Sequence, residues 1–386
     1  MSFDPQAATA AYVDALGADA LAKAAAYTDG NHWLLLWGLA ASAVVTWLIV
    51  RWGVLDRVAA RLVRRGPNLR AFAVGAAYFA VSSLMLLPWA LYDEWWREKG
   101  YGRTSQPLGD FLGQELISIV LLAVLGALFF VGVYALMRRA GRSWWIWSGA
   151  LTAFALAAFL LASPVVIEPL FNDYKPVPEG QVRDALVEMA TQSGVPADRI
   201  FVFDGSRQSN NFTANVSGVG GSARIAISDV AFKGASLEEV RAVTGHEIGH
   251  YVLHHVWRTV LMLSVLSVLF FFLADRLFPY FARAFGSRAV LSDPPGLPVL
   301  MFMMSVLGLL ALPVLNGESR GAEAAADRYS LETVGLPDAL ATALVKTAEY
   351  RNPRPSVLEE QIFYSHPSVE RRVRSAMEWK ASRTPD

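Results

Sequence analysis

Two histidines four residues apart, with a glutamate directly after the first, form the pattern His-Glu-x-x-His at positions 246–250. Residues four apart lie on the same face of a helix, so His246 and His250 can bind one metal ion. Glu247 lies about 100° around such a helix from His246, where it can hold a water on the metal without being a ligand. The pattern predicts a zinc site in which a carboxylate accepts a proton from activated water. The alternative is a solvated helix with polar residues on one face.

One helix must carry this motif, and another segment must supply the third metal ligand that the motif lacks. Residues 237–243 have the pattern of a helix that leads into it. A catalytic zinc usually takes a third protein ligand and keeps one position open. In the alanine-rich stretch 316–327, Glu323 and Asp327 are four residues apart and share a helix face. Glu323 can therefore bind the metal while Asp327 accepts a hydrogen bond from a ligand histidine. Glu318 is the alternative ligand, and an ordinary exposed acidic helix is the alternative to both.

The composition is that of a membrane protein. Of the 386 residues, 54% are hydrophobic and 18% are charged, whereas a soluble globular protein is about a quarter charged. The net charge is zero and the chain has no basic stripe, so we expect no nucleic-acid partner. The absence of cysteine excludes disulfides and cysteine-ligated zinc.

Six apolar stretches are long enough to cross a bilayer, which needs about 20 residues of helix. They are Trp33–Val50, Ala71–Leu91, Leu116–Met137, Trp144–Ile167, Val256–Leu273 and Leu297–Leu315. Tryptophan and tyrosine cluster at their ends, as they do at membrane interfaces. We therefore predict a mainly α-helical, polytopic membrane protein with about six transmembrane helices. Helices buried in a large soluble core are the alternative, and six such runs in one chain argue against it.

A polar insert between the fourth and fifth apolar stretches predicts a small mixed α/β domain at the membrane surface. Its first residues, 168–178, are too rich in proline for a helix, whereas 181–193 has helical periodicity and 200–203 has the pattern of a strand. Residues 212–217, then a turn, then residues 224–228 predict a β-hairpin. The glycines of that turn are Gly218, Gly220 and Gly221.

Four motifs in this order resemble the integral-membrane M48 metallopeptidases, most closely the Ste24 group, also called CAAX prenyl protease 1. They are Pro169-Leu170-Phe171-Asn172-x-Tyr174-x-Pro176-x-Pro178-Glu179-Gly180 with Phe203-Asp204-Gly205-Ser206, then His246-Glu247-x-x-His250, then Ser319-Arg320-x-x-Glu323-x-x-x-Asp327, and finally His366-Pro367-Ser368-Val369-Glu370-Arg371-Arg372. The resemblance covers most of the chain. It implies a zinc endopeptidase with a gluzincin-type α/β domain, and transmembrane helices that enclose a chamber.

The resemblance also implies a role for individual residues. One Zn²⁺ per chain would be held by His246, His250 and Glu323, with Glu247 as the general base. Asp327 would be the hydrogen-bond partner of a ligand. His366 and Arg372 would stabilise the oxyanion as cationic donors. The edge strand that docks an extended peptide would be Thr213-Ala214-Asn215-Val216-Ser217-Gly218.

The chain departs from the family pattern in three places. Thr213-Ala214 stands where the family usually has Asn-Ala, and six spans are present where the eukaryotic members have seven. His254 and His255 lie one turn beyond the motif, and on a continuous helix His254 shares a face with His250. We interpret both as membrane-interface residues, and contact with the metal site is the alternative.

The predicted organisation has five parts. Residues 1–32 form an N-terminal interfacial segment, 33–167 hold transmembrane helices one to four, 168–255 form the zinc-metalloprotease domain, 256–315 hold helices five and six, and 316–386 complete the catalytic domain. We expect a peptide or protein substrate, membrane-associated or lipidated, and the lipid bilayer as partners. An HtpX-like quality-control protease is one alternative. A non-catalytic membrane chaperone or scaffold with structural zinc is another, although such a site has no use for Glu247.

Two arguments about which side of the membrane the site faces give opposite answers. The high arginine and alanine content suggests a bacterial source and hence the inner membrane. The loops on the side away from the motif contain Arg51, Arg57, Arg61, Arg64, Arg65, Arg70, Arg138, Arg139, Arg142, Arg276, Arg283 and Arg288. Because loops rich in arginine and lysine usually stay in the cytoplasm, these loops would be cytoplasmic, and the site on the other side of the membrane would lie outside the cytoplasm. Resemblance to the eukaryotic enzymes implies a site that faces the cytosol.

Overall fold

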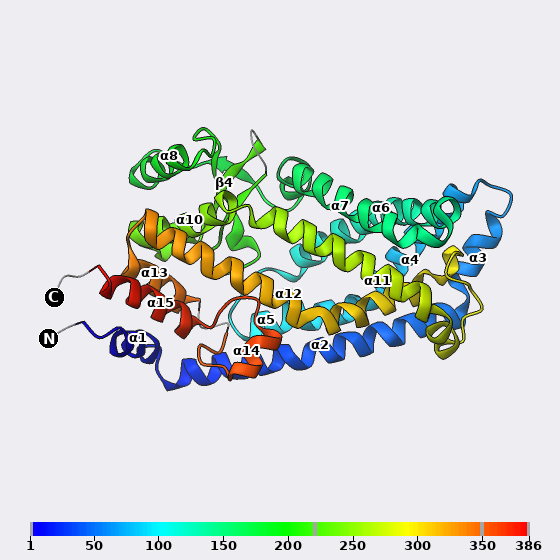
Figure 1. Cartoon of the computed structure of the whole chain (residues 1–386), viewed down its shortest axis with the longest axis horizontal. Helices are drawn as coiled ribbons and strands as arrows, with labels where there is room; N and C mark the ends of the chain where they lie inside the picture. The colour runs from blue at the N-terminus through cyan, green and yellow to red at the C-terminus, as the bar shows by residue number, and fades with distance from the viewer. Residues whose placement is uncertain (1–2, 219–221, 348–350, 384–386) are drawn as a thin grey trace.

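The computed structural model describes residues 3–218, 222–347 and 351–383. The molecule is elongated, with long helices side by side over one part of its length and a small sheet with shorter helices at the end where both termini lie (Figure 1). The mainly α-helical prediction is confirmed. Gly220 and Gly221 of the predicted turn lie outside the described residues.

Long helices coincide with all six predicted spans, although residues 163–167 of the fourth span lie beyond the end of its helix. They are α2 (Ala18–Trp52), α4 (Pro67–Ala90), α6 (Leu108–Ala140), α7 (Trp144–Ala162), α11 (His255–Phe285) and α12 (Leu297–Thr333). By length and composition, five helical stretches of the described chain could cross a membrane, and one of them, Leu108–Leu170, has 63 residues. That stretch is broken where α6 ends at Gly141, whose φ is +54°. Gly132 and Leu151, one on each side of the break, are in close contact, so α6 and α7 form a hairpin that accounts for two spans.

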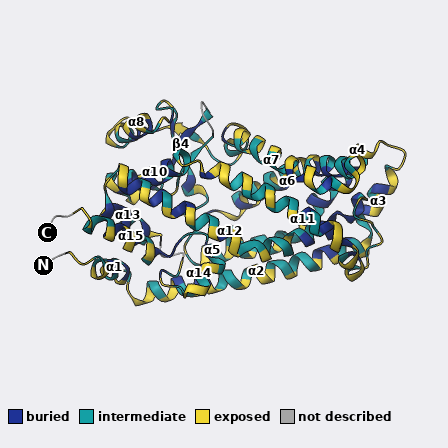
Figure 2. Cartoon of the chain, viewed as in Figure 1, coloured by how far each residue is buried: buried dark blue, intermediate teal, exposed yellow. Residues whose placement is uncertain are grey.

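Small residues allow these helices to pack closely. A Cβ atom on Gly75 of α4 would lie 3.1 Å from the Cα of Ala127 in α6, and one on Gly149 of α7 would lie 3.2 Å from the carbonyl oxygen of Ser264 in α11. Such contacts are typical of helices that associate in lipid. Exposed residues lie along much of the bundle (Figure 2). Many of them are large and apolar, as a lipid-facing surface requires.

The small sheet lies at the end of the molecule that carries the motif. Its strands are β1 (Tyr174–Pro176), β2 (Ile200–Phe203), β3 (Ala214–Ser217) and β4 (Arg224–Ser228), in the order β1-β2-β4-β3. The antiparallel pair β3–β4 confirms the predicted hairpin and leaves β3 at an edge. The predicted helix over 181–193 is α8 (Gln181–Ser193). Strand β1 was not predicted, because a three-residue strand that ends in proline has no alternating pattern.

The motif helix is α10 (Leu237–Val252), which follows the short α9 (Ala231–Gly234). Ser236 and Glu239 form a capping box at its first turn, which fixes where the helix begins. It ends before His254, whose φ of +56° lies in the left-handed region, and α11 begins one residue later. The helix therefore bends sharply between the motif and the fifth span.

Shorter helices complete this end of the molecule. They are α13 (Pro337–Lys346), α14 (Val357–Phe363) and α15 (Val369–Ala381), while α3 (Val54–Arg61) and α5 (Arg97–Gly100) lie in loops between the long helices. The N-terminal helix α1 (Pro5–Asp14) packs against the core of α13 and α15, and Tyr12 donates a hydrogen bond of 2.9 Å to Asp338. The N-terminal segment thus joins the C-terminal helices, and α2 continues without a break through residue 32.

Candidate metal centre

The motif helix α10 and the long helix α12 pack closely beside the metal motif. Gly245 and Gly249, each directly before a motif histidine, face α12. A Cβ atom on Gly249 would lie 3.1 Å from the Cα of Ala326, and one on Gly245 would lie 2.5 Å from a methyl group of Val334. Larger residues at these two positions would push the helices apart. The glycines therefore bring the carboxylates of α12 within reach of the imidazoles of α10.

Three side chains converge at this contact. Nε2 of His246 lies 3.1 Å from Nε2 of His250 and 3.2 Å from Oε2 of Glu323, and Nε2 of His250 lies 3.4 Å from Oε1 of Glu323. A tetrahedral zinc ion with bonds of roughly 2.0–2.1 Å has ligand atoms about 3.3 Å apart. Oε2 of Glu323 is buried and has no hydrogen bond among the described residues. The donor set and its spacing therefore fit one zinc ion.

Asp327 and Arg372 lie directly behind the ligands. Oδ1 of Asp327 lies 2.9 Å from Nδ1 of His246, and both carboxylate oxygens accept hydrogen bonds of 2.7 Å from the guanidinium of Arg372. Asp327 can thus accept the Nδ1 proton of His246 and leave Nε2 free for a metal. Arg372 comes from the first turn of α15, so this chain of contacts joins three helices.

The surroundings of the site shift the pKa values of its titratable groups. Burial acts to lower the pKa of His246, but contacts with Asp327 and Glu323 outweigh it and raise that pKa to about 9. A cation at Nε2 would have to displace this proton. Burial raises the pKa of Glu247, against the effect of the neighbouring imidazoles. A raised carboxyl pKa suits a group that accepts a proton and then returns it near neutral pH.

His366 reaches the site from the connection between α14 and α15. Its Nε2 lies 3.2 Å from Oε1 of Glu323, and its Nδ1 lies 2.9 Å from Oγ of Ser365. Arg320 of α12 holds this connection by donating hydrogen bonds to the carbonyl oxygens of Glu360 and Tyr364. Burial and the nearby arginines lower the pKa of His366 to about 3, so its ring is neutral at pH 7. A neutral His366 can donate a hydrogen bond but brings no positive charge, whereas Arg372 brings one; the oxyanion roles of both residues stay predictions.

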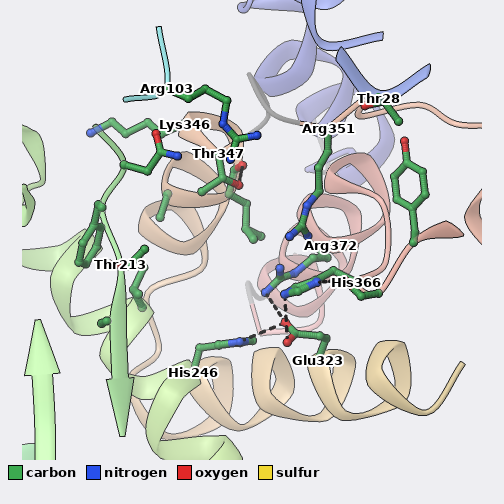
Figure 3. A pocket seen from close by; sticks show the side chains of 18 of the residues that line it. Thr28, Arg103, Thr213, His246, Glu323, Lys346, Thr347, Arg351, His366 and Arg372 are labelled. Atoms are coloured by element: carbon green, nitrogen blue, oxygen red, sulfur yellow. Dashed lines mark hydrogen bonds and ion pairs between the residues drawn. The ribbon is translucent and has the colours of Figure 1, made fainter. Parts of the chain in front are cut away.

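A cavity of about 870 Å³ opens beside this cluster. Glu247 and Tyr27, the latter from the N-terminal half of α2, lie on its wall. His366 and Arg372 lie on it as well (Figure 3). The predicted docking strand contributes Thr213 and Ala214, whereas the positions from Asn215 to Gly218 are not part of the wall. The cavity therefore lies between the sheet edge, the metal cluster and the membrane bundle, and it is large enough for several residues of a peptide.

Contacts of nearby residues bear on two other predictions. Glu318, the alternative third ligand, lies 3.4 Å from Arg258 and outside the metal cluster. The interpretation of His255 as a membrane-interface residue is wrong, because His255 is buried and its Nδ1 lies 2.9 Å from Nδ1 of His250. His254 is exposed at the helix break. The sequence reasoning assumed an unbroken helix, in which His254 shares a face with His250. The left-handed residue shifts that phase by one position.

Comparison with known families assigns both parts of the chain. Residues 176–380 match the model described as peptidase family M48, and residues 5–173 match the one described as CAAX prenyl protease N-terminal, five membrane helices. The chain is thus a multi-pass integral membrane protein. Within residues 5–173 the structure has four helices of membrane-spanning length, α2, α4, α6 and α7, beside the short α1.

Several individual proteins are similar over most of the chain. The uncharacterized metalloprotease YhfN of Bacillus subtilis is 26% identical over 92% of this chain and 85% of its own length. CAAX prenyl protease 1 of Saccharomyces cerevisiae is 26% identical over 88% of this chain and 76% of its own, and the Arabidopsis thaliana homolog is 28% identical over 76% and 70%. The crystal structure of S. mikatae Ste24p shares the fold, with a TM-score of 0.75, 20% identity and coverage of 93% and 88%.

Proposed function

The chain belongs to peptidase family M48 and is a membrane zinc metallopeptidase of the Ste24 type, and we propose the following roles for its residues. One zinc ion per chain is held by His246, His250 and Glu323. The observation that carries this proposal is the convergence of these three side chains at tetrahedral spacing, beside a cavity that His246, Glu323 and Glu247 line.

When bound, zinc supplies a Lewis acid that polarises a carbonyl oxygen and makes water nucleophilic near neutral pH. Glu247 accepts the proton of that water and later delivers it to the leaving amine. Asp327 keeps His246 in the tautomer that leaves Nε2 free. Neutral His366 donates one hydrogen bond, and Arg372 contributes its charge, to the oxygen that becomes negative in the transition state.

The substrate is a peptide segment that enters the cavity as an extended chain. The exposed edge of β3 offers backbone hydrogen bonds to such a segment, beginning at Thr213 and Ala214. A cavity of this size next to membrane helices favours short or flexible segments over folded domains. Relatives named CAAX prenyl protease 1 suggest membrane-associated or lipidated substrates. Within the five-part division of the chain, we propose that residues 168–255 and 316–386 together form the catalytic domain.

The metal-content test compares the wild type with Glu247→Gln. Both proteins, purified in detergent, are expected to bind one zinc per chain, because Glu247 is not a ligand. Cleavage of a fluorogenic peptide is expected from the wild type alone and is expected to stop with a chelator. Near-normal turnover by Glu247→Gln would refute the base assignment. Zinc without cleavage by either protein would favour a structural site, and broad cleavage of unfolded chains would favour a quality-control protease.

The charge distribution favours one orientation in a bacterial cytoplasmic membrane. The arginine-rich loops lie at α3, at the α6–α7 break and at the end of α11, at the end of the molecule away from the metal cluster (Figure 1). We place that end in the cytoplasm and the cavity on the other side.

Because the chain lacks cysteine, single cysteines at exposed positions can test this orientation without background. An impermeant maleimide added to intact spheroplasts is expected to label Gln192→Cys, on the catalytic side, and to spare Val63→Cys, in the arginine-rich loop. The reverse pattern would put the site in the cytoplasm.

A further inference from the structure

One guanidinium group on the cavity wall has no neutralising partner among the described residues. Arg351 lines the cavity, and its side chain points towards His366 and Arg372 (Figure 3). No described residue forms an ion pair or a hydrogen bond with Arg351. Arg351 is exposed, and its side chain forms part of the cavity wall. Its charge therefore faces the space that a substrate would fill.

The other cations on this wall are all paired. Arg103 lies 3.0 Å from Glu98, Lys346 lies 2.8 Å from Glu239, and Arg372 is held by Asp327. Burial and the charges of Arg372 and Arg103 lower the pKa of Arg351, which is the mark of a cation among like charges. An extra positive charge at this position is repelled by its neighbours, which lowers the stability of the folded protein. A ligand that brings a negative charge would recover it.

We propose that Arg351 binds a carboxylate of the peptide substrate. This inference rests on the proposed peptidase function and adds a specificity determinant to it. A guanidinium presents two parallel N–H donors that match a carboxylate, and such charge-assisted pairs are stronger than neutral hydrogen bonds. The carboxylate has two possible sources, the free C-terminus of the substrate or an acidic side chain. Because Arg351 points towards His366 beside the metal cluster, the bound carboxylate lies on the His366 side of the cavity.

Three peptides of one parent sequence separate these sources. The first has a free C-terminus and no acidic side chain, the second has a C-terminal amide, and the third has the amide together with one glutamate near that end. The wild type is expected to prefer the first or the third over the second by about 10-fold or more in kcat/KM, since a hydrogen bond to a charged group contributes about 1.5–3 kcal/mol. Arg351→Gln is expected to cleave all three at similar rates.

The matched control is Arg354→Gln. Arg354 is three residues away, is paired with Asp14 and Glu370, and is not part of the cavity wall. It should keep the wild-type preference. Zinc content of each variant verifies the fold. If Arg351→Gln does not fold, Arg351→Lys takes its place, which keeps the charge, loses the paired donors and is expected to reduce the preference in part.

Binding separates this inference from the proposed function. The same peptides are titrated into Glu247→Gln protein, with and without Arg351→Gln, and followed by calorimetry. If no peptide is cleaved by the wild type, the peptidase proposal fails, while the binding preference still decides the role of Arg351. Loss of preference for the free C-terminus in the Arg351 variant supports the α-carboxylate, and loss for the glutamate peptide supports the side chain. A preference unchanged by Arg351→Gln, or none in the wild type, overturns the inference.

Discussion

Replacing His255 with alanine is expected to weaken zinc binding, although His255 is not one of the proposed ligands. His255 is buried at the start of α11, and its Nδ1 lies 2.9 Å from Nδ1 of His250. When Nε2 of His250 binds a metal, its Nδ1 carries a proton that needs an acceptor. Because that acceptor is His255, the contact fixes both the tautomer and the orientation of the ligand ring.

The size of the effect follows from what the substitution leaves behind. A buried donor without a partner costs about 1–3 kcal/mol, and each 1.4 kcal/mol is about a factor of ten in a binding constant. We therefore expect His255→Ala to weaken zinc binding by roughly 10- to 100-fold, the usual range for removing the outer partner of a ligand histidine. The matched control is His254→Ala, because His254 is exposed one residue away and lies outside the metal cluster.

Zinc affinity of the detergent-purified variants is measured by competition with a chelating indicator. Thermal unfolding of the metal-free proteins reports any general loss of packing, which a cavity at His255 would also cause. His255→Gln keeps an oxygen acceptor and is expected to recover part of the affinity. Wild-type affinity in His255→Ala, or equal weakening by His254→Ala, would refute the reasoning.

Three further predictions concern the helices and charges around the cluster. Gly249→Ala is expected to destabilise the protein by about 1–3 kcal/mol and to weaken zinc binding, because its Cβ meets the backbone of α12. Gly321→Ala, whose Cβ meets nothing within 4 Å, should not lower thermal stability or zinc content, since alanine is the better helix former. Asp327→Asn removes the nearest counter-charge of the buried guanidinium of Arg372 and leaves only the longer contact with Glu323, so a loss of roughly 3–5 kcal/mol is expected in denaturant unfolding. Since the metal-free protein keeps a proton on His246 up to about pH 9, apparent zinc affinity should rise with pH towards 9 and fall about tenfold per unit below it, as binding isotherms at several pH values would show.

Local spacing made the first part of the site predictable. His246 and His250 are one helical turn apart, and so are Glu323 and Asp327, so each pair could be placed on a helix face from periodicity alone. The apolar runs likewise predicted the long helices, since bilayer thickness sets their length. Periodicity could not predict that α10 and α12 pack against each other. That contact depends on glycines and on the connections of the whole helix bundle. The roles of His366 and Arg372 came from family resemblance alone.

His255 shows why sequence reasoning missed a residue at the site. A helix of constant phase places His254 on the face of His250, and the same reasoning assigns His255 to the membrane interface. One residue with a φ of +56° breaks that phase and turns His255 inward. A non-glycine residue in this conformation is uncommon, and histidine is among the residue types that tolerate it best. The sequence signal was weak, namely two adjacent histidines where a membrane helix begins.

The continuous helix α12 couples the metal cluster to the membrane bundle. Its first part lies in the bundle, and the same helix, without a linker, carries Glu323 and Asp327 and holds the His366 connection through Arg320. A helix transmits displacement because its backbone hydrogen bonds keep it stiff. Any change in the packing of α12 among the membrane helices must therefore move one proposed zinc ligand relative to the two on α10. The break at His254 gives α10 no such rigid connection to α11, so the distance between the two ligand helices depends on the glycine contacts at Gly245 and Gly249.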